Sequence, residues 1–301
     1  MPEWREFKVG RPSERANFTN SDCQPLTHVS HVTHVDTALR VIEDGGIRAG
    51  LIHDESKLNV ERILVAWLSP NHWHHGSRYG NIRLQFHWES LIEGRRAYWV
   101  ESIAYKVPAC RILLSRCDRS GILDPYDPEI GDGPWWYDRK SRAHYWNGEY
   151  CLEIMVEDDI DLNKAEILDF ENHHQAYCSI DPAGCPDKGL RADNAGARFI
   201  AELLGSGLDI HRDLVTDPDN TGKPSRRMHN ALGELIVRLE KLMEQDSRGS
   251  IKSTNDRAIP LVRAVLAATG RGDISSARAL ASLFKSVRSL RNACRNLLEA
   301  R

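Results

Sequence analysis

The chain has 301 residues and a formal net charge of −3, and 41% of its residues are hydrophobic against 28% charged. This composition is typical of a folded globular protein and excludes wholesale disorder, and the length suits two domains. The longest apolar run, 63–68, is far too short to cross a bilayer, and residues 1–6 contain no apolar signal core. We therefore expect a cytoplasmic protein that is not attached to a membrane.

Charged and aromatic residues are distributed unevenly along the chain. Residues 225–301 hold 15 Lys and Arg against 7 Asp and Glu, whereas residues 1–224 hold 25 against 36. All eight tryptophans lie at or before Trp146. We therefore expect four parts: an N-terminal arm (1–24), an α+β domain (25–205), a linker (206–224) and a basic helical domain (225–301).

Short β-type runs alternate with turns in the first part of the chain. We predict strands at 26–35, 63–68, 81–86, 97–105, 109–115, 150–156 and 166–170. Residues 116–148 show no periodicity, and we predict a long loop there. A loop of this length inside a compact domain usually carries function.

Helices are predicted from apolar stripes and from capping residues. One helix has Asp36 as its N-cap, a buried face of Ala38, Leu39 and Ile42, and an end at Gly45. Shorter or later helices are expected at 88–93, 191–204 and 256–269. Everything after Ser225 is expected to be helical, with one apolar stripe from Leu232 to Leu242 and another from Leu280 to Leu297.

The first predicted strand carries His28, His31 and His34. Side chains alternate along a strand, so His28 and His34 share a face while His31 points the other way. A metal site made of these three histidines is therefore not expected. Polar residues at the rim of a sheet are the simpler interpretation.

Glu153 is a carboxylate in the apolar run 150–156. Alternation places it opposite Leu152 and Ile154, so it should lie either at the solvent or in a cleft. An isolated strand glutamate usually faces solvent, so the pattern alone favours a structural role.

The turn 69–80 follows an apolar strand and combines small residues, aromatic residues and Arg78. Small residues let a ligand approach the backbone, aromatic rings stack on flat ligands, and an arginine can pair with a phosphate. The same composition also suits a generic loop.

Histidine and cysteine gather near residue 180, where His173, His174, Cys178 and Cys185 lie within thirteen residues. The chain has seven cysteines and no secretory signal, which favours free thiols or a metal site over a disulfide framework. Tetrahedral zinc takes such ligands, but the spacing matches none of the tight zinc-finger patterns. We assign no metal, and a structural zinc stays as an alternative.

Several of these segments, taken in order, resemble one enzyme family. Residues 33–36 with the helix 38–42 and the run 47–50 are similar to the opening strand and helix of the ADP-ribosyltransferase fold, above all to the DarT-type enzymes that modify DNA bases. Residues 152–162 are similar to the family segment with the catalytic glutamate, and Ser69-Pro70 fits the segment that closes over the cofactor. The resemblance covers roughly residues 25–171 and extends to toxins of phage-defence toxin–antitoxin systems, some of which act on RNA.

The resemblance implies an α+β domain with a split sheet that transfers ADP-ribose from NAD to a DNA or RNA base, as a toxin or defence effector with an antitoxin as partner. Breaking the bond between nicotinamide and ribose produces an oxocarbenium-like cation, which a nearby carboxylate stabilises. Glu153 would be this carboxylate, with His34 beside it. NAD would be held by Thr33, His34, Asp36, Ser69, Ser77, Arg78 and Tyr79, and nucleic acid by Arg288, Arg291 and Arg295.

Two other readings of the sequence are weighed against this one. A Rossmann dinucleotide site is disfavoured, because no G-x-G-x-x-G follows a predicted strand. The alternative from another class is a non-enzymatic module that binds RNA or protein through the basic helical tail and is stabilised by zinc. A binding module should not depend on Glu153.

Overall fold

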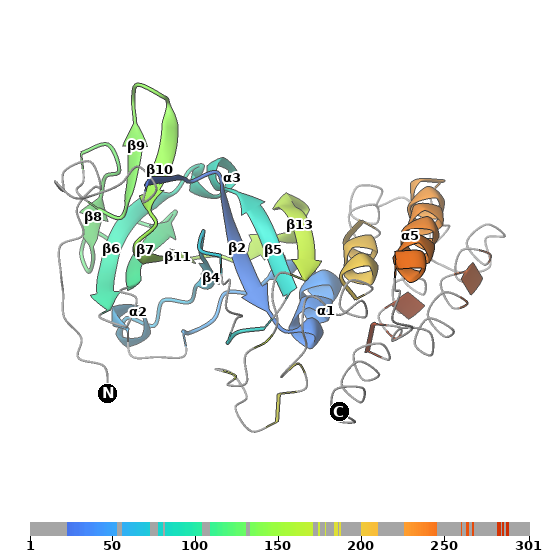
Figure 1. Ribbon diagram of the computed structural model, residues 1–301. Coiled ribbons are helices and arrows are strands. Elements are labelled where there is room, and N and C mark those ends of the chain that lie inside the picture. The colour runs from blue at the N-terminus through green and yellow to red at the C-terminus, as the bar shows by residue number, and fades with distance from the viewer. Residues whose placement is uncertain are drawn as a thin grey trace. The chain divides into compact units, whose positions relative to one another are not determined.

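The computed structural model of the chain (Figure 1) describes residues 23–52, 56–72, 78–80, 82–103, 109–130, 133–170, 174, 178, 184–185, 187, 200–209 and 226–245, with single positions at 260, 263, 264, 267, 282, 283, 285, 287 and 288. These residues form a mixed α+β fold, as predicted, with several small sheets. Within the described ranges, no helix combines the length and the apolar character needed to span a membrane.

The strands are short. They are β1 (Cys23–Pro25), β2 (His28–Thr33), β3 (Gly46–Ile47), β4 (Ala66–Leu68), β5 (Ile82–His87), β6 (Arg96–Ile103), β7 (Ala109–Ser115), β8 (Asp124–Tyr126), β9 (Trp135–Asp138), β10 (Ala143–Asn147), β11 (Cys151–Val156), β12 (Ile160–Asp161) and β13 (Ala165–Phe170). The helices are α1 (Val35–Asp44), α2 (Lys57–Val60), α3 (Trp88–Ile92), the 3-10 helix η3 (Leu162–Lys164) and α5 (Arg226–Gln245), and residues 200–209 are also helical.

The largest sheet has five strands in the order β4-β11-β7-β6-β8. β11 pairs with β7 in parallel, and all other neighbours are antiparallel. Every residue of β7 and of β11 is buried, so these two strands form the centre of the sheet. Val100, Leu113 and Met155 belong to one core cluster that joins β6, β7 and β11.

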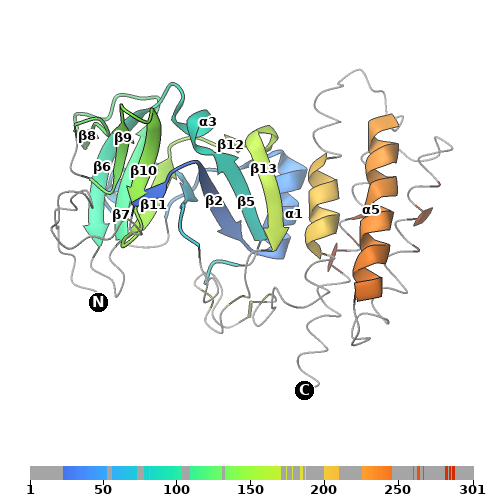
Figure 2. The same ribbon diagram turned by 45° about the horizontal axis from the view of Figure 1, so that its top comes forward.

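The other sheets are smaller, with the strand orders β1-β10-β9, β12-β3 and β13-β5-β2. Figure 2 shows β9 and β10 as adjacent strands, and they pair antiparallel. The predicted loop at 116–148 is therefore wrong, because this segment contains β8, β9 and β10. Its Trp135 and Trp146 are buried, so the aromatic residues form core where the sequence lacked an apolar alternation.

The predicted N-terminal arm and the predicted start of helix α1 both differ slightly from the structure. Cys23–Pro25 pairs with β10, so the last two residues of the predicted arm form strand, and residues 1–22 lie outside the described part. Helix α1 begins two residues earlier than predicted, with His34 and not Asp36 as its N-cap. Its end is as predicted, because Gly45 adopts the left-handed conformation with φ 75° that favours glycine.

The chain divides into two compact units that alternate along the sequence. The first unit consists of residues 1–31, 46–72 and 85–166, and the second of 32–45, 73–84 and 167–301. The expected linker and helical domain both fall within the second unit. Most of the linker lies outside the described residues, but 206–209 are helical. In α5 the predicted stripe is buried at Leu232, Leu235, Ile236 and Leu239.

Candidate functional site

Glu153 lies at the centre of the five-stranded sheet, opposite a buried arginine. The strand register places Glu153 of β11 beside Arg111 of β7, and Arg111 beside Glu101 of β6. Arg111 donates from Nε to Glu153 Oε2 at 2.6 Å and from Nη1 to Glu101 Oε1 at 3.0 Å. The three residues are 7%, 4% and 6% exposed, in the order Glu153, Arg111 and Glu101. We call this group the carboxylate–arginine triad.

Glu101 is also held by the start of helix α2. Ser56, the N-cap of α2, donates from Oγ to Glu101 Oε1, and the backbone N–H of Lys57 donates to Glu101 Oε2 at 3.2 Å. The N-terminus of a helix favours a negative charge nearby. Glu101 therefore has contacts to a helix end that position it independently of Glu153.

The triad combines two carboxylates with one guanidinium, which leaves one negative charge in a buried place. An opposite charge at hydrogen-bond distance favours the ionised form of a carboxylate even where burial disfavours it. Two neighbouring thiols respond to this charge. Burial and the charge of Glu153 raise the pKa of the Cys110 and Cys151 thiols, so both stay protonated at neutral pH. Neither cysteine is therefore a thiolate nucleophile.

The solvent-facing alternative for Glu153 is wrong, because β11 is buried at every residue, on both of its faces. Sequence analysis did not find Arg111 and Glu101. The only available signal was a charged residue inside each of two apolar runs, 97–103 and 109–115. Which charges would meet depended on the strand register, and no local pattern shows that register.

Ser69 is the one predicted NAD-binding residue that lies in the same unit as Glu153. It is buried, exchanges backbone hydrogen bonds with Ser30, and donates from its Oγ to Asn71 Oδ1 at 2.8 Å. Asn71 in turn accepts from the backbone N–H of Leu152 at 2.9 Å. Asn71 thus connects the segment after β4 to Leu152, the residue that precedes Glu153 in β11.

The other residues predicted to bind NAD do not share that unit. Thr33 and His34 are buried, whereas Arg78 and Tyr79 are exposed. Ser77 lies outside the described residues. The second unit contains Thr33, His34, Asp36, Arg78 and Tyr79.

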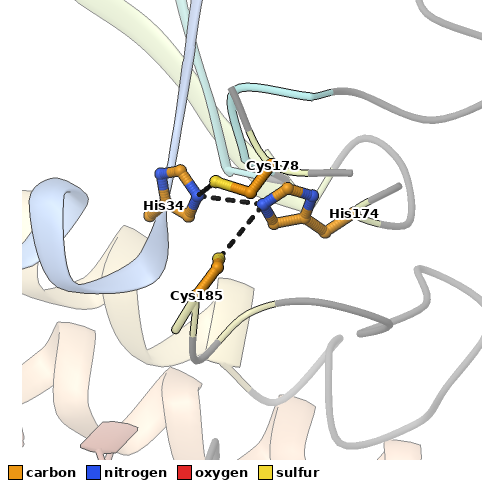
Figure 3. Close-up of side chains that lie close together, drawn as sticks. All are labelled: His34, His174, Cys178 and Cys185. Carbon is orange, nitrogen blue, oxygen red and sulfur yellow. Dashed lines mark hydrogen bonds between the residues drawn. The ribbon is translucent and has the colours of Figure 1, made fainter. Parts of the chain in front are cut away.

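A second candidate group of side chains lies in the second unit. Figure 3 shows the side chains of His34, His174, Cys178 and Cys185 pointing toward one another. The Nε2 atoms of the two histidines are 2.9 Å apart, Cys178 Sγ is 3.3 Å from His34 Nε2, and Cys185 Sγ is 3.3 Å from His174 Nε2. All four side chains are buried, and their ligand atoms lie within 4.8 Å of one another. We call this group the His₂Cys₂ cluster.

Sequence analysis found three members of this cluster and missed the fourth. His174, Cys178 and Cys185 come from the predicted His/Cys segment, while His173 lies outside the described residues. The missing member is His34, which was expected to serve NAD. It lies 140 positions before His174 in the sequence, so no spacing rule could have joined them. The six described cysteines are free of disulfides.

The three histidines of the first predicted strand have different partners. The rings of His28 and His87 lie 4.5 Å apart, and His31 Nδ1 donates to the backbone oxygen of Trp67 at 2.8 Å. His34 belongs to the His₂Cys₂ cluster. The rim interpretation therefore does not apply to His34, which is buried.

Acid is expected to destabilise the fold through His31. Burial lowers the pKa of this imidazole below its usual 6.5, although the hydrogen bond to Trp67 opposes the shift. Below pH 6.5 the unfolded chain therefore binds a proton that the folded chain does not, and the free energy of unfolding falls as the pH falls. We expect His31→Gln to flatten the dependence of this free energy on pH between 7.5 and 5.5, measured by urea unfolding, with His28→Gln as the control substitution. An unchanged slope in His31→Gln would rule out this source of acid sensitivity.

The segment 116–148 contributes to a cavity of about 500 Å³ in the first unit. Its wall includes Arg95, Arg96, Tyr126, Trp135 and His144. The rings of Tyr126 and Trp135 stack with centroids 5.6 Å apart. Burial lowers the pKa of His144 and so favours its neutral form, although the charge of Glu89 opposes this shift. Stacked rings beside arginines suit a flat ring that carries an anionic group.

Of the three arginines predicted to bind nucleic acid, only Arg288 is described, and it lies near acidic side chains of α1. Its guanidinium is 3.7 Å from Asp36 Oδ1 and 4.0 Å from Glu43 Oε1. All three side chains are well exposed, so these contacts contribute little stability. Arg291 and Arg295 lie outside the described residues.

Comparisons with protein-family models, with curated proteins and with solved structures found no match for this chain.

Proposed function

We propose that the chain is an NAD-dependent ADP-ribosyltransferase, similar to the DarT-type enzymes, that modifies a nucleic-acid base as a toxin or defence effector. Glu153 is its catalytic carboxylate in this proposal. The observation that carries it is the hydrogen-bonded ion pair between Glu153 and Arg111 at 2.6 Å, which joins the neighbouring strands β11 and β7 of the five-stranded sheet.

The chemistry needs a carboxylate that is ionised when the transition state forms. Loss of nicotinamide leaves a positive charge on the ribose, and only the charged form of a glutamate can offset it. Arg111 places an opposite charge at hydrogen-bond distance from Glu153, which favours the charged form.

Fixed geometry adds to this electrostatic argument. Arg111 holds Glu153 through a short charge-assisted hydrogen bond, and Asn71 fastens the segment after β4 to the strand beside it. A preorganised charge costs no reorganisation when the reaction occurs. The mixed pairing of β11, parallel to β7 and antiparallel to β4, also suits the split sheet that the resemblance implies.

The test uses NAD labelled in its adenylate phosphate and the full-length chain, incubated separately with DNA, RNA and protein. We expect label to enter DNA or RNA, and nicotinamide to be released at the same time. Label in protein alone would refute the nucleic-acid part of the proposal. Neither transfer nor nicotinamide release with any substrate would refute the use of NAD.

A second candidate function is a binding module without catalysis, and the His₂Cys₂ cluster is the observation that favours it. Such modules use a closed metal site to stabilise a small fold. A binding module would bind RNA or a protein equally well with Glu153 or with glutamine at that position. An effect of Glu153→Gln on NAD turnover would therefore show that the chain is more than a binding module.

The basic tail is expected to bind the phosphate backbone of the nucleic-acid substrate. Replacing Arg288, Arg291 and Arg295 by glutamine should weaken nucleic-acid association and flatten its salt dependence, by about 0.9 in log–log slope per lost phosphate contact. Hydrolysis of free NAD should be unchanged, because phosphate contacts position the substrate and take no part in the chemistry. Filter binding at several salt concentrations gives the slope. An unaltered slope would instead indicate that the tail contacts the acidic side chains of α1 or an antitoxin.

A further inference from the structure

We propose that the chain binds one structural zinc ion through His34, His174, Cys178 and Cys185. The four side chains come from two places in the sequence, are all buried, and direct one ligand atom each toward a common centre. Glu153 belongs to the other unit, and His34, which the resemblance assigned to the NAD site, is a zinc ligand in this proposal.

The spacing of the ligand atoms is close to that of a zinc tetrahedron. Zinc bonds of about 2.0 Å to nitrogen and 2.3 Å to sulfur place two ligand atoms of a tetrahedron about 3.3 to 3.8 Å apart. In the His₂Cys₂ cluster the nitrogen–nitrogen distance is 2.9 Å and the two nitrogen–sulfur distances are 3.3 Å. The remaining pairs of ligand atoms lie within 4.8 Å of one another, so small shifts of these side chains would bring all four to the distances of a zinc tetrahedron.

The charges of this donor set also fit zinc. Two cysteine thiolates balance the charge of Zn²⁺, and two neutral imidazoles add none, so the buried site is neutral overall. Buried polar groups are costly unless they are satisfied, and one ion satisfies all four donors at once. Sulfur and imidazole ligands in a tetrahedral arrangement select zinc over Mg²⁺ or Ca²⁺, which prefer oxygen.

Four protein ligands close the coordination shell of the ion. A catalytic zinc has three protein ligands and keeps one position for water or substrate, whereas a structural zinc has four. The ion is therefore structural, and it takes no part in activating a nucleophile.

The contacts around the cluster show what the ion would hold together. His34 is the N-cap of α1, and the other three ligands lie between 174 and 185, so the ion joins the start of α1 to a segment 140 residues later. Asp187, two residues after Cys185, accepts a hydrogen bond from the backbone N–H of Val35 at 2.6 Å. The two segments are thus joined at two successive positions of α1, by the ion at His34 and by Asp187 at Val35.

The backbone at His34 is constrained from a third side. Gly80 has φ 133°, and a Cβ at this position would lie 2.1 Å from the carbonyl carbon of Thr33 and 2.4 Å from the backbone nitrogen of His34. Only glycine allows this approach. A ligand held this firmly is preorganised for a metal, which lowers the cost of binding.

The test measures metal in the full-length chain purified without chelator. Elemental analysis should find about one zinc per chain, and His34→Ala, His174→Ala, Cys178→Ser and Cys185→Ser should each reduce it severalfold. Cys117→Ser and His87→Ala are the matched controls, because both residues lie outside the cluster, and they should keep the metal. Glu153→Gln should also keep it, so a failure of the proposed catalysis leaves this result unaffected.

Ligand variants can fail to fold, so two measurements use the wild-type chain. Exchange of the ion for Co²⁺ should give the visible bands of a tetrahedral site and a thiolate-to-metal absorption in the near ultraviolet. Chelation should lower the melting temperature by about 5 °C or more. A metal-free chain with a melting temperature that chelator does not change would overturn the proposal. A disulfide between Cys178 and Cys185 in that chain, or zinc retained by His34→Ala, would also overturn it.

Discussion

Glu153→Gln is expected to slow the transfer of ADP-ribose from NAD about 100-fold or more while the fold stays intact. The substitution keeps the size of the side chain and removes the charge that offsets the oxocarbenium ion. Arg111 retains Glu101 as a partner, 3.0 Å from its Nη1, so the guanidinium is not left buried without an anion. Initial rates of nicotinamide release and of label transfer, with a melting curve for each variant, measure the two effects separately.

Two further substitutions distinguish catalysis from structural support. Glu101→Gln removes the same charge from the other side of Arg111 and should cost much less activity than Glu153→Gln, because in the proposal Glu101 touches no reacting atom. Glu157→Gln removes a carboxylate that pairs with Arg119 just beyond β11, and it should leave the rate unchanged. Equal losses of activity in Glu101→Gln and Glu153→Gln would indicate that the triad supports the fold and has no catalytic role. Wild-type turnover in Glu153→Gln would show that another residue is the catalytic carboxylate.

Arg111→Met is expected to lower the free energy of unfolding by about 3 to 5 kcal/mol. The methionine fills much of the volume of the arginine, but it leaves Glu101 and Glu153 as buried carboxylates without their common cation. Both lie on strands next to β7, so the sheet holds the two carboxylates near each other in a buried place. Urea unfolding monitored by circular dichroism gives the free-energy difference.

A combined variant tests the cause of that loss. Adding Glu101→Gln and Glu153→Gln to Arg111→Met removes all three charges, and a buried ion cluster replaced by neutral groups often regains stability. We expect the triple variant to be more stable than Arg111→Met alone. A loss below about 1 kcal/mol in Arg111→Met, or no recovery in the triple variant, would indicate that the buried charges do not depend on one another.

Local patterns predicted those elements whose ends are determined by nearby residues. Helix α1 ends where predicted, because Gly45 supplies a left-handed backbone conformation within the helix itself. Its start was misplaced by two residues, and there Asp187 contacts the backbone of Val35 from a segment 152 residues away. Such a contact depends on the tertiary fold, and the sequence near Val35 contains no sign of it.

The segment 116–148 could not be predicted for a different reason. The strands β9 and β10 are rich in aromatic residues, and the Gly, Pro and Asp residues of 121–134, before β9, interrupt any apolar alternation. Their burial comes from ring contacts such as Trp88 with Trp135, whose planes are nearly perpendicular at 86°. Hydrophobic periodicity alone therefore predicts a loop where strands are stabilised by aromatic packing in this way.

The two candidate sites were found unequally from the sequence. The resemblance singled out Glu153, but its partner Arg111 became visible only through the register of β11 and β7. The His/Cys segment suggested zinc, but His34 joins it only because β2 and α1 bring that residue to the segment in the folded chain. In both sites, the residues that were not predicted from the sequence are contributed by other elements of the fold.

The most direct test of the proposed activity is mass spectrometry of nucleosides from DNA and RNA after incubation with the full-length chain and NAD. We expect one nucleoside to gain the mass of ADP-ribose with the wild-type chain, and to gain at most about one hundredth as much with Glu153→Gln over the same time. Unmodified nucleosides with the wild-type chain, or equal modification by both chains, would contradict the assignment of Glu153 as the catalytic carboxylate of an ADP-ribosyltransferase that acts on nucleic acid.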